Sequence, residues 1–265
     1  MTAPQIVTKP AGTASRGFGT TLRMDRWSVE PGIVGLVFTG FVIYSLISAL
    51  LLTPAVLGVP YEADGYISPF FSPLLVFPFL PSWFSPAIII LWIPLGFRTT
   101  CYYYRKAYYR AFFFDPPACA VGEPFFHRKY VMETRFPFIL QNLHRLFLYL
   151  AFIPLAFLWL DVLASLRYQD QFRIGLGGLI LFVNVTLLTG YSLSCHSLRH
   201  LAGGGLDCFS CSARTKARYG IWKRLTWMNQ IHARWAWASL LSVMAGDLFV
   251  RLLALGVIAD PAIRF

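Results

Sequence analysis

Residues 195–211, CHSLRHLAGGGLDCFSC, contain half of the cysteine and histidine side chains of this chain, which are side chains that can bind a metal. Three of the five cysteines and two of the five histidines lie in this segment. His196 and His200 are four residues apart, so on a helix they share one face and can chelate a single metal ion. After three glycines comes a second pair, Cys208 and Cys211, at a spacing that also suits one metal ion.

Together, the four residues predict a site with two nitrogen and two sulfur ligands. A closed tetrahedral zinc site uses this set, and so does a Rieske-type [2Fe–2S] centre, with two Cys on one iron and two His on the other. The spacing differs from the familiar Rieske pattern, so the residues leave both centres open. Cys195 could replace one cysteine, and His232 could replace one histidine. The alternative without a metal is that these side chains pack or bind backbone carbonyls.

The surrounding composition is that of an integral membrane protein. Of the 265 residues, 57% are hydrophobic, 17% aromatic and 13% charged. A soluble domain carries about 25% charged residues. Several apolar segments reach the roughly 20 residues that cross a hydrocarbon core. The net charge of +11 could suggest a nucleic-acid partner. However, the basic residues alternate between loops, which is typical of membrane topology, so we expect no nucleic acid.

The pattern predicts an all-α membrane protein, a bundle of five transmembrane helices over residues 31–257. The N-terminal arm, residues 1–30, is polar and shows no signal-peptide pattern, and residues 258–265 form a C-terminal tail. The first connection contains four prolines within 65–83, so we expect a loop there. Pro94 should kink the second span. The five spans are expected at about 32–55, 86–113, 138–161, 174–198 and 225–257.

Lysine and arginine are distributed unequally between the connections. The N-terminal arm has four, residues 98–135 have seven and residues 199–224 have six. Residues 60–84 have none, residues 162–173 have two and the tail has one. This asymmetry predicts a cytoplasmic N-terminus and an external C-terminus. Residues 195–211 then face the reducing cytoplasm, where we expect the thiols to be free or metal-bound instead of disulfide-bonded.

A second unusual segment, FRTTCYYYRKAYYRAFFFDPP, combines aromatic and basic residues. On one continuous helix, Arg98, Tyr102, Arg105 and Tyr109 would lie close to one face. Such a face offers hydrogen-bond donors and a flat wall to a quinone, and His127 follows in the same cytoplasmic connection. The alternative is an aromatic belt with cytoplasmic anchors.

Two further features lie within the spans. His144, near the cytoplasmic end of the third span, could be a haem ligand, a quinone contact or a hydrogen-bonding partner between helices. Asp247 and Arg251, four residues apart in the fifth span, are expected to form a structural ion pair near the outer interface.

Three segments carry a family resemblance: FRTTCYYYRKAYYRAFFFDPPACAVGE, HRKYVMETRFPFILQNLHR, and SCHSLRHLAGG with LDCFSC. They resemble the single-chain membrane anchor of actinobacterial succinate dehydrogenase 1. The resemblance covers about residues 85–257, and the CHSLRH and CFSC motifs are its most specific part.

The resemblance implies a three-subunit complex II in the bacterial plasma membrane. A flavoprotein oxidises succinate, an iron–sulfur subunit carries the electrons, and the anchor passes them to menaquinone. The family implies a Rieske-type cluster in the anchor, which favours iron–sulfur over zinc at His196, His200, Cys208 and Cys211. It also favours a quinone site at the tyrosine–arginine face. The chain then takes part in the enzyme without catalytic residues for flavin chemistry.

Two other functions stay open. Related five-helix anchors bind two haems through four histidines, and this chain has five. All five are expected near the cytoplasmic side, whereas two haems need ligands at both membrane depths, so haem is the weaker prediction. The other alternative is a transporter or structural membrane protein with a zinc clip. The spans, however, show few charges along a pathway and no inverted repeat.

Overall fold

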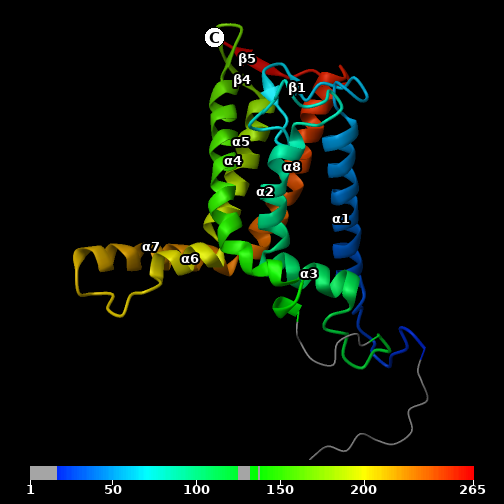
Figure 1. The fold of residues 1–265 in the computed structure, drawn as a ribbon, viewed down its shortest axis with the longest axis vertical. Coiled ribbons are helices and arrows are strands. Elements are labelled where there is room, and N and C mark those ends of the chain that lie inside the picture. Colours follow the sequence, from blue (N-terminus) through cyan, green and yellow to red (C-terminus); the bar gives the residue numbers. More distant parts are fainter. Residues whose placement is uncertain (1–16, 125–131, 137) are drawn as a thin grey trace, which may run out of the picture.

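Upright apolar helices form a bundle in the computed structural model, which describes residues 17–124, 132–136 and 138–265 (Figure 1). Four of the described helices are long and apolar enough to cross a membrane. A fifth upright helix, α2 (Ala87–Thr99), has 13 residues and is about 20 Å long at 1.5 Å per residue. The four long spans are α1 (Val29–Leu46) with its π-helical extension (Ile47–Leu51), the 3-10 turn Phe138–Leu143 with α4 (His144–Ser165), α5 (Leu176–Leu193) and α8 (His232–Ala254).

The prediction of a mainly helical membrane protein is confirmed, but the expected second span, 86–113, is two helices. The chain turns at Thr100 and Cys101, and α3 (Tyr102–Phe113) runs across the base of the bundle (Figure 1). The reason is charge: α3 carries three basic residues in YYYRKAYYRAFF and would be costly to keep in hydrocarbon. The helix therefore breaks where the apolar run of α2 ends.

The other two spans that were expected to run into basic segments are also divided, each by a break of its own. The segment expected at 174–198 stops at Leu193, and a separate helix, α6 (His196–Gly203), follows. The segment expected at 225–257 divides at Ile231 between α7 (Ala213–Gln230) and α8. We call the end of the bundle that carries α3, α6 and α7 the basic end.

Short strands cover the opposite end, which we call the strand end. There, β1 (Glu62–Ala63) pairs antiparallel with β2 (Tyr66–Ile67). A second antiparallel sheet has the order β3-β4-β5, in which Ile174 lies opposite Ile263. The proline-rich connection is a loop, as its prolines predicted. The strands of the second sheet are β3 (Arg167–Tyr168), β4 (Gln171–Gly175) and β5 (Ala262–Arg264).

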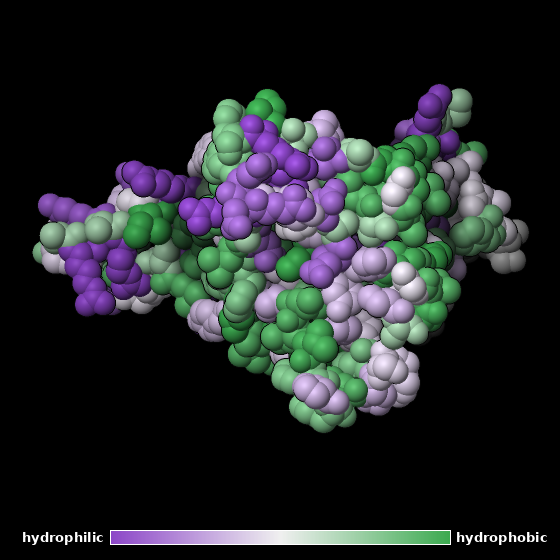
Figure 2. Space-filling view, turned by 90° about the horizontal axis from the view of Figure 1, so that it is seen from above, coloured by the Kyte–Doolittle hydropathy of each residue, from purple (hydrophilic) through white to green (hydrophobic). Residues whose placement is uncertain are grey.

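The outside of the bundle is apolar. Large hydrophobic side chains of the spans, such as Leu36 on α1 and Leu163 on α4, are exposed to more than half of their area. Viewed from the strand end, hydrophobic side chains cover much of the surface, and hydrophilic ones gather over the strands and on a projecting arm (Figure 2). This distribution fits a multi-pass protein whose sides face lipid.

A buried ionic network ties α1 to α8 near the strand end. Asp247 and Arg251 form the predicted i, i+4 ion pair, with 3.4 Å between Oδ1 and Nε, and both side chains are almost fully buried. Asp247 accepts hydrogen bonds from the hydroxyls of Tyr44 and Ser48, while Arg251 donates to the carbonyl oxygens of Pro60 and Ser48. Because both charges have several partners, neither is left alone in a low-dielectric region.

Replacing Arg251 with Ala should therefore destabilise the protein by about 3–5 kcal/mol, since Asp247 would remain buried without a cation. Thermal unfolding of the purified protein in detergent measures the effect. The exposed Arg264→Ala variant on β5 is the control. Equal midpoints for the two variants would contradict a stabilising role of the pair.

Candidate functional site

Two cysteines occupy equivalent positions where apolar helices end at the basic end. Cys101 precedes α3 and Cys195 precedes α6, and both have extended backbone (φ −68°, ψ 131° and φ −62°, ψ 134°). Each follows a hydroxyl residue, Thr100 or Ser194. Each sulfur-bearing residue is only 1% exposed. The chain thus makes the same turn twice and buries one thiol at each turn.

The hydroxyl groups and the thiols are linked crosswise by two histidines. Thr100 Oγ1 lies 2.8 Å from Nδ1 of His144, whose Nε2 lies 3.3 Å from the sulfur of Cys195. Ser194 Oγ lies 2.6 Å from Nδ1 of His232, whose Nε2 lies 3.5 Å from the sulfur of Cys101. Each hydroxyl orients the imidazole that faces the other turn's thiol. We call Cys101, His144, Cys195 and His232 the Cys–His cluster.

The two histidine–cysteine pairs form one group, in which Cys101, Cys195 and His232 are buried and His144 is half-buried. Cys101 and Cys195 belong to the same buried core at the basic end. Burial raises the pKa of the Cys195 thiol, which is therefore protonated at neutral pH unless a metal displaces its proton.

Aromatic rings cover both imidazoles. Phe97 stacks on His144 with 4.9 Å between ring centroids and an interplanar angle of 9°, and Tyr191 stacks on His232 at 5.0 Å and 20°. The guanidinium of Arg98 lies 4.9 Å from the centre of the Tyr191 ring and donates to Ser239 at 3.1 Å. Each ring covers one face of an imidazole, and Arg98 places a positive charge beside Tyr191.

A large apolar cavity of about 410 Å³ adjoins this region. It lies between α1, α2, α4, α5 and α8, and nearly all of its lining is aliphatic or aromatic. Phe97 and Tyr191, the rings that stack on the two imidazoles, are also part of its wall. Arg98 and Ser192 line the same end of the cavity and offer polar atoms there. One ring therefore separates the cavity from each histidine of the cluster.

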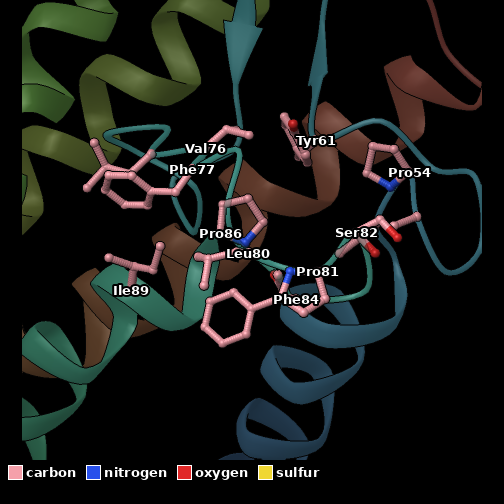
Figure 3. A pocket seen from close by; sticks show the side chains of 14 residues that line it. Pro54, Tyr61, Val76, Phe77, Leu80, Pro81, Ser82, Phe84, Pro86 and Ile89 are labelled. Carbon is pink, nitrogen blue, oxygen red and sulfur yellow. The ribbon is translucent and has the colours of Figure 1, made fainter.

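A second, smaller pocket of about 150 Å³ lies near the strand end (Figure 3). Pro81, Phe84 and Pro86 crowd one side of it, and Tyr61 and Ser82 contribute polar side chains. Among the described residues that line it there is no histidine, cysteine, carboxylate or cation. Its side chains therefore suit neither metal binding nor proton transfer.

The predicted metal ligands do not assemble. His196 and His200 share a face of α6 as expected, with 3.0 Å between their Nε2 atoms, and both are exposed. Cys208 and Cys211 are joined by a disulfide, which contradicts the prediction that they are free or metal-bound. Their Cα atoms are 5.8 Å apart, a usual disulfide separation. No three Cys, His, Asp or Glu side chains of the described residues meet around a single point suited to one metal ion.

Cys195 and His232, which the sequence offered as substitute metal ligands, both belong to the Cys–His cluster. Sequence reasoning did not consider Cys101 as a ligand, and it considered His144 for other roles. One signal was present: a hydroxyl residue followed by Cys ends an apolar run twice, in RTTCYYY and in SLSCHSL. Without the tertiary structure, however, nothing indicates that these two turns lie side by side.

The predicted quinone residues are separated by the break at Cys101. Arg98 lines the cavity, but Tyr102 is 59% exposed on α3, with Arg105 stacked on its ring. Arg105 also pairs with Glu133, while Tyr109 is buried. The i, i+4 spacing assumed one continuous helix, so the expected common face does not form. His127 lies outside the described residues.

Comparisons with known proteins agree with one another. A family model described as actinobacterial succinate dehydrogenase subunit SdhC matches residues 29–256. A chain in the structure titled "Mycobacterium smegmatis Sdh1 complex in the apo form" is similar to this chain, with 41% sequence identity and a TM-score of 0.78. The match covers 91% of this chain and 92% of that chain. Among curated proteins no match is found.

The stacking of Tyr191 on His232 depends on close packing of α5 against α8. A Cβ atom on Gly190 would lie 2.4 Å from the Trp235 ring, so Gly190→Ala should force the helices apart and cost about 1–3 kcal/mol. Gly220→Ala on α7, where no atom lies within 4 Å, is the matched control. Thermal unfolding of both variants tests this packing. An unchanged midpoint for Gly190→Ala would show that this contact is not tight.

Proposed function

The chain belongs to the family of actinobacterial succinate dehydrogenase membrane subunits, and from that premise we propose that it passes electrons to menaquinone at the basic end of its bundle. It is a multi-pass membrane anchor subunit of a bacterial succinate dehydrogenase. We propose that a flavoprotein subunit and an iron–sulfur subunit dock on the basic end. The excess of Lys and Arg at this end favours the cytoplasmic side, where succinate is oxidised.

The Cys–His cluster has the donor set of a Rieske-type [2Fe–2S] centre, two thiols and two imidazoles. A [2Fe–2S] centre of this kind would take its four ligands as two thiolates and two imidazoles, and Cys101, Cys195, His144 and His232 would supply them. Each histidine also has its second nitrogen held by a hydroxyl group, an arrangement that fixes the ring orientation of metal-binding histidines. These features support Cys101, His144, Cys195 and His232 as the ligands.

When bound, such a cluster accepts and gives up one electron at a time at a potential above that of an all-cysteine cluster. The residues of the chain contribute the surroundings. Thr100 and Ser194 orient the imidazoles, and Phe97 and Tyr191 each cover one face of an imidazole. Arg98 adds a fixed positive charge next to Tyr191, which favours the arrival of negative charge nearby.

One observation carries the proposal: Phe97 and Tyr191 are walls of both the cluster and the cavity. An apolar cavity that opens among membrane spans suits the isoprenoid tail of a quinone. Arg98 and Ser192 supply hydrogen-bond donors for a quinone carbonyl oxygen at the end nearest the cluster. We therefore infer that the quinone ring lies there, one aromatic ring away from the electron donor.

Dihaem binding receives no support from the described histidines. His144, His196, His200 and His232 all lie at the basic end. Two haems at different membrane depths would need at least two histidines near the strand end, and none of the described residues there is a histidine.

Variants of the two candidate ligand sets test the cluster. Cys101→Ser and His144→Ala should each abolish the low-g rhombic EPR signal of a His-ligated [2Fe–2S] centre in the reduced complex, and should lower the iron content by two atoms per complex. The double variant His196→Ala/His200→Ala should keep both. Because the partner subunit has its own clusters, the spectra are compared as differences from the wild type.

If His196→Ala/His200→Ala abolished the signal while Cys101→Ser and His144→Ala kept it, the ligand set predicted from the sequence would be correct. A signal that survives all of these variants, or zinc in place of the additional iron, would exclude a Rieske-type cluster in this subunit. Electrons would then reach the quinone directly from the partner subunit.

A matched pair of alanines on α4 tests the cavity. Ala151 lines it, whereas Ala156 is exposed on the outside of the same helix. Ala151→Leu should fill part of the cavity and reduce kcat/KM for a water-soluble quinone about tenfold, the loss typical of a misplaced methylene group. Ala156→Leu should change little. Succinate oxidation with an artificial acceptor should stay normal in both variants; equal quinone kinetics in the two would argue against this cavity.

A further inference from the structure

The helices α6 and α7 and the loop between them form an arm, residues 196–230, that leaves the basic end sideways (Figure 1). The 18 residues of α7 extend about 27 Å. The arm runs across the direction of the spans. In a membrane it therefore extends parallel to the bilayer surface and does not point away from it.

One face of α7 is held against α6. Arg218 donates to the carbonyl oxygens of Ala202 and Gly204 at 3.0 and 2.9 Å, which ties α7 to the end of α6. Arg199 on α6 stacks on Trp222, and Leu225 is buried. The orientation of α7 about its own axis is thus determined by contacts within the arm.

The opposite face of α7 is exposed and largely apolar. At 100° per residue, Ala217, Ile221, Trp227 and Met228 fall within one sector about 120° wide. Ile221 is 52% exposed and Trp227 is 65% exposed. A tryptophan and an isoleucine so open to solvent need an apolar or interfacial surrounding to be favourable.

Basic residues border this apolar stripe. Lys216 and Lys223 follow one edge, Arg214 lies at the other, and Arg224 lies within it. The arm contains six Lys and Arg residues and a single acidic residue, Asp207. None of the four ion pairs in the described part of the chain involves the arm. These charges are therefore uncompensated by the subunit itself.

We propose that the arm lies in the polar boundary of the bilayer and binds anionic phospholipid head groups. Ile221 and Trp227 then reach the first part of the acyl chains, while Lys216, Lys223 and Arg224 contact phosphates. This is the composition of helices that lie in a membrane interface, with Trp and aliphatic residues beside Lys and Arg. Long basic side chains can cover the apolar stripe with their stems and still reach the head groups.

A protein partner fits this face less well. Lysine is depleted in protein interfaces, whereas Lys216 and Lys223 border the stripe and remain exposed. Viewed from the strand end, the direction from which the bilayer would cover the arm, strongly hydrophilic and hydrophobic side chains alternate on it (Figure 2). The inference is independent of the proposed electron route.

The purified complex in detergent, titrated with phosphatidylglycerol and with phosphatidylcholine, tests lipid binding by native mass spectrometry. The triple variant Lys216→Gln/Lys223→Gln/Arg224→Gln should bind phosphatidylglycerol about tenfold more weakly, since each basic residue contributes to attraction by anionic lipid. The control removes three exposed basic residues elsewhere, Arg26→Gln/Lys106→Gln/Arg135→Gln, and should keep the wild-type affinity.

The depth of Trp227 in the bilayer is tested separately, in nanodiscs that contain phosphatidylcholine with brominated acyl chains. The quenching of tryptophan fluorescence in the wild type minus that in Trp227→Phe reports Trp227 alone, and it should be positive. No quenching of Trp227, or equal phosphatidylglycerol binding by the two triple variants, would overturn the proposal. Loss of partner subunits from the first triple variant with unchanged lipid binding would instead identify the face as a protein interface.

Discussion

The two crossed contacts between hydroxyl groups, imidazoles and thiols are the arrangement on which the basic end depends. They exist because two apolar helices, α2 and α5, end in the same way, with a hydroxyl residue followed by an extended cysteine. In hydrocarbon a helix cannot end without leaving backbone groups unsatisfied, so such turns are confined to the boundary. Because both turns occur at the same depth, the two cysteines lie beside each other, and the histidines at the start of α4 and α8 can span the distance between the turns.

The strand end is stabilised in a different way. There, charged groups are buried inside the bundle, and their cost is offset by many hydrogen bonds. Asp247, Arg251 and the hydroxyl groups of α1 connect segments about 200 residues apart in sequence. This network holds α1 against α8 near the strand end, and α1 also contributes one wall of the apolar cavity. The cavity thus extends from Pro69 and Phe70 near the strand end to Arg98 and Ser192 near the basic end.

The proposed function rests on how these parts adjoin. A soft N2S2 donor set lies at the basic end, where we propose that the soluble partners dock, and an apolar cavity begins one aromatic ring away. An electron carrier needs this closeness, whereas a structural metal clip does not. Arg98 connects the two regions, since it stacks on Tyr191 and also lines the cavity. The arm extends the same end of the protein along the membrane surface.

The sequence by itself determined the class of protein, the family, the apolar spans and the excess of basic charge at one end, because hydropathy and loop charge act locally along the chain. It also predicted the Asp247–Arg251 pair, whose spacing on one helix needs no tertiary information. Only the tertiary structure decided which cysteines and histidines meet. The visible motifs, HSLRH and CFSC, lie on an exposed arm, whereas Cys101 and His144 are 43 residues apart and distant in sequence from Cys195 and His232. Their meeting depends on two helix breaks and on packing between α4, α5 and α8, which no local pattern specifies.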